Sequence, residues 1–178
     1  MNNFIYENST KVYFGQGCVK EFLSSLTRDS RNILLASGLR SAKKNGIYDE
    51  VLNILMADGK NVVDFSGIMP NPTYQKVLEG IDLVKKNDVD LILGIGGGSV
   101  MDCAKAVSLG ARCSGDPWEN FWGRKGIVDF PPVPVGVIPT TAGTGSECNG
   151  AAVITNEKTK VKIGYDYAKC NPVFALMD

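Results

Sequence analysis

The sequence predicts an α/β fold: a Rossmann-like parallel sheet with helices on both faces and an N-terminal β-hairpin. Two observations carry this prediction. Short apolar runs alternate with segments whose apolar residues recur every three or four positions, the pattern of strands alternating with amphipathic helices. The connections are short, as in βαβ units. With 178 residues, 44% of them hydrophobic, the chain suits a single domain with a substantial core.

The elements follow in chain order. Residues 4–6 and 12–14 flank a polar turn and are predicted to form the hairpin. A helix follows Gly17, where apolar residues recur at helical spacing up to residue 26. Further strands are predicted at 32–36, 61–65, 90–93, 133–138 and 173–177. Further helices are predicted over 47–55, 73–86 and 99–110. The segments 151–155 and 161–165 form a second predicted hairpin.

An irregular excursion is expected at 115–125, where glycine and proline interrupt the pattern. It contains Trp118 and Trp122, which are four residues apart, and we expect both to pack in the core.

Charge and cysteine content exclude several function classes. Nineteen basic residues balance nineteen acidic ones, so no overall field attracts nucleic acid or an anionic membrane. The five cysteines are an odd number without C-x-x-C spacing, which argues against a disulfide framework and a zinc ribbon. No signal-peptide pattern and no apolar run of about 18 residues occurs. We therefore expect a cytoplasmic protein without nucleic-acid or membrane partners.

The most informative stretch runs from Gly94 to Lys105. Gly96, Gly97 and Gly98 precede Ser99 between an apolar strand and a helix, and glycines let a backbone approach a diphosphate closely. We expect Ser99 to cap the helix. Serine at 99 departs from G-x-G-x-x-G, and no lysine–serine/threonine pair makes a P-loop. The alternative is a turn that only permits close packing.

A second loop strengthens the first interpretation. Thr140, Thr141 and Thr144 lie in the run 139–147, which is rich in hydroxyl groups and glycine and follows another apolar strand. Because the carboxyl ends of parallel strands meet at one edge, both loops are predicted to face one ligand.

Asp102 and Lys105 are three residues apart and therefore share one face of the glycine-initiated helix. A surface ion pair is the simpler explanation for such a pair. Their position in the first turns of the helix instead fits residues that organise the glycine turn.

The turn after the strand 32–36 bears on cofactor choice. It contains Gly38, Arg40 and Ser41, and the first acidic residue after the strand is Asp49. A ribose without a 2′-phosphate is usually held by a nearby carboxylate, whereas a 2′-phosphate requires arginine. The turn therefore favours NADP(H) over NAD(H). The alternative is an ordinary loop with solvated basic residues.

The order of these motifs resembles the iron-dependent, or group III, alcohol dehydrogenase family. The matching segments are Phe14-Gly15-Gln16-Gly17, Pro70-Asn71-Pro72-Thr73, Gly96-Gly97-Gly98-Ser99-x-x-Asp102-x-x-Lys105 and Pro139-Thr140-Thr141-x-Gly143-Thr144-Gly145-Ser146-Glu147. The resemblance implies that the chain is a dinucleotide-binding domain over residues 1–178. It also implies that Asn71 and Asp102 bind the cofactor and that Lys162 contacts its ribose.

In the resembling family, a following helical domain binds a divalent metal through one aspartate and three histidines. This chain has no histidine. We therefore expect a truncated cofactor domain that is inactive alone and contains no catalytic or metal-binding residues, with iron or zinc bound only in the full-length enzyme. The implied activity is hydride transfer between NAD(P)(H) and a small alcohol, aldehyde or ketone. N-terminal strands commonly lie at a dimer interface in this family, so a homo-oligomer is expected.

Two other functions remain open from the sequence. One is a dinucleotide-binding module without chemistry, such as a sensor. The other is a relative such as glycerol dehydrogenase or dehydroquinate synthase, although the full motif at 140–147 favours the alcohol dehydrogenases.

Overall fold

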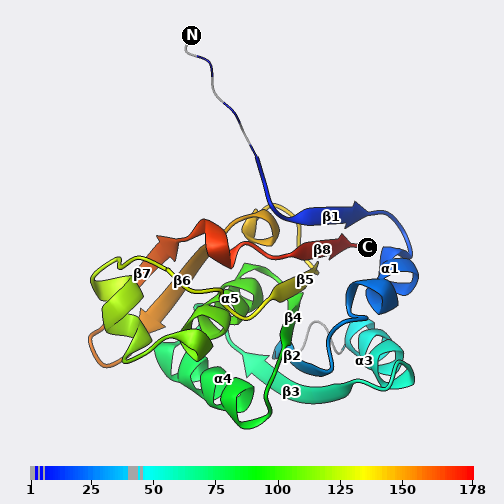
Figure 1. The fold of residues 1–178 in the computed structure, drawn as a ribbon, viewed down its shortest axis with the longest axis horizontal. Helices are drawn as coiled ribbons and strands as arrows, with labels where there is room; N and C mark the ends of the chain where they lie inside the picture. The colour runs from blue at the N-terminus through cyan, green and yellow to red at the C-terminus, as the bar shows by residue number, and fades with distance from the viewer. Residues whose placement is uncertain (1–2, 4, 6, 40–43, 45) are drawn as a thin grey trace.

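A parallel sheet forms the centre of the molecule. The computed structural model describes residues 3, 5, 7–39, 44 and 46–178, and within them six strands pair in parallel in the order β1-β8-β5-β4-β2-β3 (Figure 1). The strands are β1 (Lys11–Phe14), β2 (Asn32–Gly38), β3 (Asn61–Ile68), β4 (Leu91–Gly96), β5 (Val135–Pro139) and β8 (Phe174–Met177). This architecture confirms the predicted Rossmann-like α/β class.

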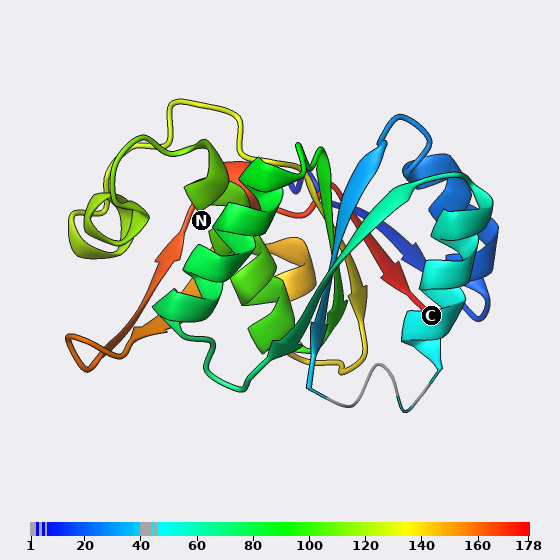
Figure 2. The same cartoon turned by 90° about the horizontal axis from the view of Figure 1, so that it is seen from below.

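Helices cover both faces of the sheet, as Figure 2 shows. One face carries α1 (Cys18–Leu26) and α3 (Ile47–Ala57), and the other carries α4 (Tyr74–Lys86) and α5 (Gly98–Arg112). The side chains of β2 alternate between these layers. Leu34 packs on the α4 and α5 side, while Ile33 and Leu35 pack on the α1 and α3 side. The predicted apolar run at 32–36 is therefore a strand buried on both faces.

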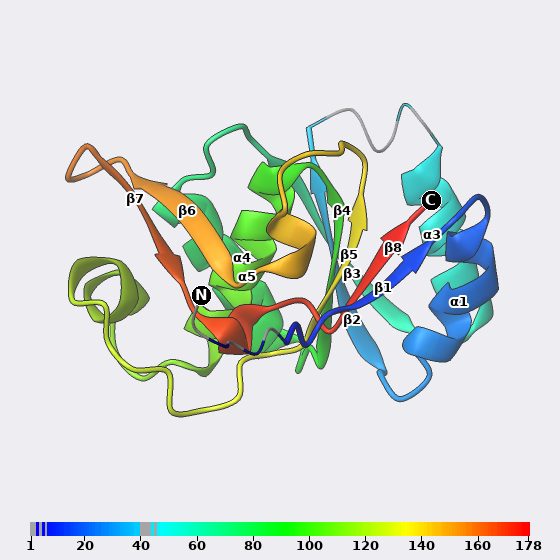
Figure 3. The same ribbon diagram turned by 90° about the horizontal axis from the view of Figure 1, so that it is seen from above.

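The predicted second hairpin is confirmed. β6 (Ala151–Asn156) pairs antiparallel with β7 (Val161–Asp166), and Figure 3 shows this pair on the side of the sheet that carries α4 and α5. The residues between α5 and β5 include a short π-helix, η1 (Trp118–Gly123). Trp118 and Trp122 are buried with their rings stacked at 5.8 Å, so they are core residues as expected.

The second arm of the predicted N-terminal hairpin pairs differently, so the hairpin prediction is wrong for that arm. β1 joins the sheet edge in parallel with β8, with Lys11 opposite Phe174 and Phe14 opposite Met177. The physical reason is that a short two-stranded hairpin is unstable alone, whereas the edge of the sheet offers unpaired backbone groups. Residues 4 and 6, which belong to the predicted first arm, lie outside the described residues.

Candidate functional site

Two segments meet at the carboxyl edge of the sheet: the glycine turn, residues 96–99, and the threonine loop, residues 139–147. Gly96 at the end of β4 pairs with Pro139 at the end of β5, and the Thr140 amide donates to the Gly96 carbonyl at 3.0 Å. The two loops therefore leave adjacent strands side by side, as predicted from the convergence of parallel strand ends.

The turn requires small residues at its centre. A Cβ atom on Gly96 would lie 2.6 Å from a methyl group of Val100, which is a steric clash. A Cβ atom on Gly97 would lie 3.7 Å from the Thr141 hydroxyl, and one on Gly98 would lie 3.3 Å from the Thr144 methyl. The glycines thus let the start of α5 and the threonine loop approach each other closely.

The start of α5 supplies hydrogen-bond donors at the glycine turn. Gly97 is the N-cap residue, and its carbonyl accepts from the amides of Val100 and Met101 at 3.0 and 3.2 Å. The amides of Gly98 and Ser99 open the helix, where N–H groups have no carbonyl partner within the helix. Such amides and the helix dipole favour an anion.

The predicted capping role of Ser99 is wrong. The cap lies two residues earlier, at Gly97, and no side chain caps the helix. Gly97 adopts an extended backbone with ψ of −170°, so the helical conformation begins at Gly98 and places Ser99 inside the first turn.

Asp102 connects α5 to the threonine loop and to β6. Its Oδ1 accepts from the Ser146 hydroxyl at 2.7 Å, and its Oδ2 accepts from the Val153 amide at 3.1 Å. The Asp102 side chain is 17% exposed. It therefore holds the threonine loop and β6 against α5.

Lys105 is buried rather than paired at the surface. Its ammonium donates to the Ser146 hydroxyl at 2.8 Å and to the Asn149 carbonyl at 3.0 Å, and it lies 3.8 Å from Asp102 Oδ1. Burial lowers the pKa of Lys105 to about 8, and the nearby Asp102 carboxylate opposes that shift. The simpler prediction of a surface ion pair is therefore wrong. The lysine side chain lies between α5 and the turn 146–149.

Gly38 and Asn71 lie at or just after the ends of the neighbouring strands β2 and β3, and Lys162 lies in β7. Gly38 ends β2, and a Cβ atom there would meet the Ile68 carbonyl and Val100 at 3.6 Å, which is ordinary contact. Asn71 follows β3 and accepts a hydrogen bond from the Lys162 ammonium at 2.5 Å. Asn71 and Lys162 are both exposed, and Asn71 has a φ of 54°. Arg40 and Ser41 lie outside the described residues.

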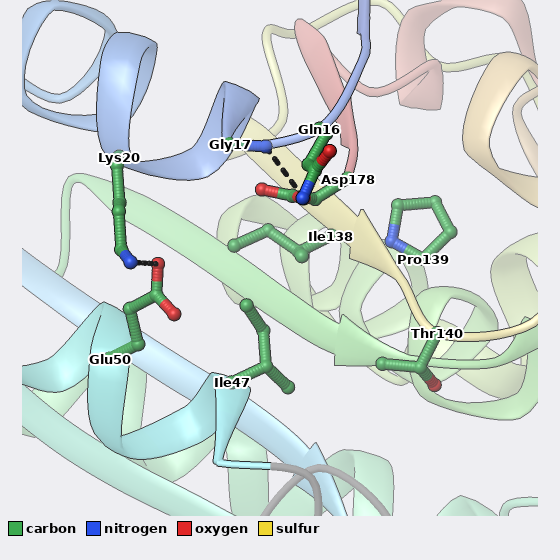
Figure 4. Close-up of a pocket in the computed structure, with 9 residues that line it drawn as sticks. All are labelled: Gln16, Gly17, Lys20, Ile47, Glu50, Ile138, Pro139, Thr140 and Asp178. Atoms are coloured by element: carbon green, nitrogen blue, oxygen red, sulfur yellow. Dashed lines mark hydrogen bonds and ion pairs between the residues drawn. The ribbon is translucent and has the colours of Figure 1, made fainter.

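A cavity of about 430 Å³ adjoins the threonine loop on the side of α1 and α3 (Figure 4). Ile47, Ile138 and Pro139 supply apolar walls, and Lys20 forms an ion pair with Glu50 at 3.9 Å at its side. A second cavity of about 430 Å³ is lined by Phe14, Thr141 and Met177 among others. Both cavities share Gln16, Pro139, Thr140 and Asp178, so they flank one strand end.

Asp178 has a structural role at the edge of these cavities. Its carboxylate accepts from the Gly17 amide at 2.9 Å and from the Val19 amide at 3.2 Å, at the start of α1. A carboxylate at a helix N-terminus satisfies unpaired amides and complements the helix dipole.

Sequence reasoning missed several of these residues. Ser146 and Asn149 join the Lys105 network, and Gln16 and Asp178 line the cavities. One signal was present: within the run 103–107 the neighbours of Lys105 are cysteine, alanine and valine, which favours burial. Contacts that join segments about 40 residues apart leave no local pattern.

Metal-binding and membrane-spanning features are absent from the described part of the chain. No group of three histidine, cysteine, aspartate or glutamate side chains gathers there. No helix among the described residues has the length and apolar character needed to cross a bilayer.

Comparisons with known proteins identify the family. The model of the family described as iron-containing alcohol dehydrogenase matches residues 9–178. The probable NADH-dependent butanol dehydrogenase 2 of Bacillus subtilis is 40% identical over 178 residues, which are all of this chain and 45% of that protein. The NADPH-dependent aldehyde reductase of Escherichia coli is 36% identical over 181 residues, covering all of this chain and 46% of that protein.

Solved structures show the same fold. The crystal structure of NADH-dependent butanol dehydrogenase A from Thermotoga maritima superposes with a TM-score of 0.92 at 41% identity. The match covers 100% of this chain and 44% of that one. The chain thus spans about half the length of the curated relatives that it matches.

Proposed function

The chain belongs to the iron-containing alcohol dehydrogenase family, and from that premise we propose that it forms the dinucleotide-binding domain, residues 1–178, of a metal-dependent oxidoreductase. The reaction interconverts a small alcohol with an aldehyde or ketone. The relatives named for butanol and aldehyde substrates support this substrate class.

One observation carries the proposal: the glycine turn at the start of α5 and the threonine loop lie side by side at the carboxyl edge of the sheet, where the Thr140 amide donates to the Gly96 carbonyl at 3.0 Å. Cβ atoms on Gly97 and Gly98 would lie within 3.7 Å of Thr141 and Thr144. A diphosphate suits the edge that these two loops form, because the amides at the start of α5 can donate to it and the glycines, which have no side chains, let it approach. The bound nicotinamide would supply the hydride donor or acceptor.

The surrounding residues bind and orient the dinucleotide in this proposal. Gly96, Gly97, Gly98 and Ser99 hold the diphosphate, with Thr140, Thr141 and Thr144 on the opposite side. Asp102, Asn71 and Lys162 contact other parts of the cofactor, and Lys162 contacts its ribose. The hydrogen bond between Lys162 and Asn71 supports a shared role for these two residues, since it brings β7 to the loop after β3.

NADP(H) is the proposed cofactor in preference to NAD(H). Gly38 supports this, because no side chain at the end of β2 opposes a 2′-phosphate and the space beside it is free of backbone clashes. Arg40 and Ser41 complete the proposed phosphate contacts. The relatives are named for both cofactors, so the preference is a separate proposal from dinucleotide binding itself.

The metal belongs to another part of the full-length enzyme in this proposal. The chain has no histidine, and its described residues form no cluster of three metal-binding side chains. Iron or zinc would bind in a helical domain beyond this chain and polarise the substrate oxygen.

A homo-oligomer in the cytoplasm is the proposed state of the protein. β1 is an edge strand, and its Phe14 side chain is 84% exposed, which suits pairing with a second copy. Sedimentation velocity of the purified protein tests this, and a single monomeric species would contradict it.

Calorimetric titration of the purified protein with NADPH and with NADH tests the dinucleotide site. We expect saturable binding of both with one site per chain, and tighter binding of NADPH. Absence of binding by either dinucleotide would overturn the proposed function, whereas equal affinities would overturn only the proposed preference.

A further inference from the structure

We propose that Lys105 is a positioning residue of the dinucleotide site: from inside the protein, its ammonium fixes the threonine loop and the Asp102 carboxylate relative to the glycine turn. This inference rests on the proposed function, because it concerns how that site is held ready for its ligand.

Burying the Lys105 ammonium removes a charge from water, and this cost must be offset by interactions inside the protein. The Lys105 side chain is 0% exposed, and a fully buried lysine is rare unless it is paired. An apolar side chain of similar length would fill the same volume without the cost of removing a charge from water. The packing of α5 alone therefore does not explain a lysine at this position.

The ammonium contacts one short segment almost exclusively. It donates to the carbonyl and hydroxyl oxygens of Ser146 at 2.9 and 2.8 Å, and to the carbonyl and side-chain oxygens of Asn149 at 3.0 and 3.1 Å. Ser146 lies near the end of the threonine loop, and Asn149 follows that loop by two residues. Lys105 thus fastens the far end of the threonine loop to the helix whose start forms the glycine turn.

These contacts also set the direction of the hydrogen bond to Asp102. An ammonium group can only donate, so the Ser146 oxygen accepts from Lys105. The single hydroxyl proton of Ser146 then points to Asp102 Oδ1, 2.7 Å away. The Val153 amide holds Oδ2 at 3.1 Å. The carboxylate of Asp102 is therefore fixed in one orientation while part of it remains exposed.

Ser146 also connects Lys105 to the glycine turn, through Thr144. The Ser146 amide donates to the Thr144 hydroxyl at 3.3 Å, and the Thr144 methyl faces Gly98. A shift of Ser146 would move Thr144 toward or away from the glycine turn. Lys105 acts on the ligand through these residues and does not itself line either cavity of the site.

The test is the affinity for NADH, measured by calorimetry alongside thermal stability. Lys105→Met keeps the length of the side chain and removes its donors. We expect it to weaken NADH binding about tenfold or more, by analogy with the loss of a hydrogen bond to a charged group. Ser146→Ala, which keeps the lysine, should weaken binding by less.

A matched control separates positioning from general destabilisation. Ser108→Ala lies one turn further along α5 and removes a buried hydrogen bond to the Val133 carbonyl, near the amino end of β5. We expect Ser108→Ala to lower the melting temperature and to keep the NADH affinity within about twofold. Equal loss of affinity in Ser108→Ala and Lys105→Met would show a merely structural role and overturn the inference.

The pH profile gives a second readout that a structural role would not move. NADH affinity of the wild type should fall as pH rises from 7 to 9.5, because Lys105 loses its charge near pH 8, and Lys105→Met should show no such fall. The other groups that face Lys105 are the Asp102, Glu147 and Asp166 carboxylates and the Cys170 thiol, whose pKa is raised by burial to about 11.

The outcomes separate this inference from the function beneath it. Wild-type protein that binds no NADH would overturn both. Wild-type protein that binds NADH, with Lys105→Met equally tight at every pH, would overturn only the role of Lys105. If Lys105→Met fails to fold, Ser146→Ala and the wild-type pH profile decide, and unchanged affinity in both overturns the inference.

Discussion

Gly38 is the residue on which the cofactor preference depends most directly. It ends β2 without a side chain, and a Cβ atom there would make only ordinary contacts at 3.6 Å. A carboxylate can therefore be introduced without a backbone clash, at the strand end where an acidic residue usually holds the adenosine ribose.

Gly38→Asp is expected to shift preference from NADPH toward NADH by about ten- to a hundredfold, because a carboxylate beside the 2′-phosphate changes one charge contact worth roughly 1.5–3 kcal/mol. Gly38→Asn is the control, since it has the same shape without the charge. Calorimetric affinities for both cofactors check this. The same NADPH to NADH ratio in wild type and Gly38→Asp would leave the turn as an ordinary loop.

Lys105 predicts how stability depends on pH. Its pKa is about 8 when folded and 10.5 when exposed, so between these values the unfolded chain binds more protons. The free energy of unfolding therefore rises with pH between about 8 and 10.5. Below about pH 8 the lysine is charged in both states, and the full cost of burying that charge opposes folding. The difference in free energy of unfolding between wild type and Lys105→Met should shift in favour of wild type from pH 7.5 to pH 10. Denaturant titrations at both values measure it; a constant difference would contradict the lowered pKa.

At the scale of elements, close approach of α4 and α5 holds the layer beneath the site. A Cβ atom on Gly80 of α4 would lie 2.5 Å from a Val107 methyl and 2.9 Å from the Phe65 ring. On the facing helix, a Cβ atom on Gly110 would lie 2.4 Å from Ile81. The two helices therefore touch where each lacks a side chain.

Gly80→Ala should destabilise the protein by a net of about 1–2 kcal/mol, because overpacking outweighs the gain of about 1 kcal/mol in helix propensity. Lys85→Ala, at an exposed position of the same helix, is the control and should be nearly neutral. Urea unfolding at 25 °C measures both. Increased stability in Gly80→Ala would mean that the helices can separate at little cost.

The elements themselves were largely predictable, because an apolar run buried on both faces and a helical repeat are local patterns. The strands β2 and β4 and the helix α4 appear close to where periodicity places them. The pairing of β1 with β8 was not predictable, since it joins residues more than 160 positions apart. Local signals favoured a hairpin because only neighbouring segments are visible to them.

The candidate site also has a part that the sequence predicted and a part that it did not. Glycine and hydroxyl content marked the two loops, and strand convergence brought them together correctly. The network around Lys105 was missed because spacing along one helix shows only Asp102 as a partner. Ser146 and Asn149 become its partners through the fold of a distant loop.

At the scale of the whole molecule, the proposed division of labour predicts that this chain alone performs no chemistry. The purified 178-residue protein should oxidise no alcohol and reduce no aldehyde, because it lacks histidine and its described residues form no metal cluster. Absorbance of NADPH at saturating substrate, with added iron or zinc, checks this. Turnover abolished by a chelator would contradict it.

The central claim is that the glycine turn at the start of α5, beside the threonine loop, holds a dinucleotide diphosphate. Gly97→Ala tests it, because the added methyl group would lie at ordinary distance, 3.7 Å, from Thr141 and so preserve the fold while adding a side chain to the turn that the diphosphate must approach. Gly94→Ala is the matched control: its methyl group would face Ala104 in the core at 3.6 Å.

The decisive measurement is therefore the calorimetric affinity of wild type, Gly97→Ala and Gly94→Ala for NADPH, at equal folded fractions. We predict a loss of about tenfold or more in Gly97→Ala, since a lost contact to a charged group is worth roughly 1.5–3 kcal/mol, and near wild-type affinity in Gly94→Ala. Wild-type affinity in Gly97→Ala would contradict a diphosphate bound at the glycine turn.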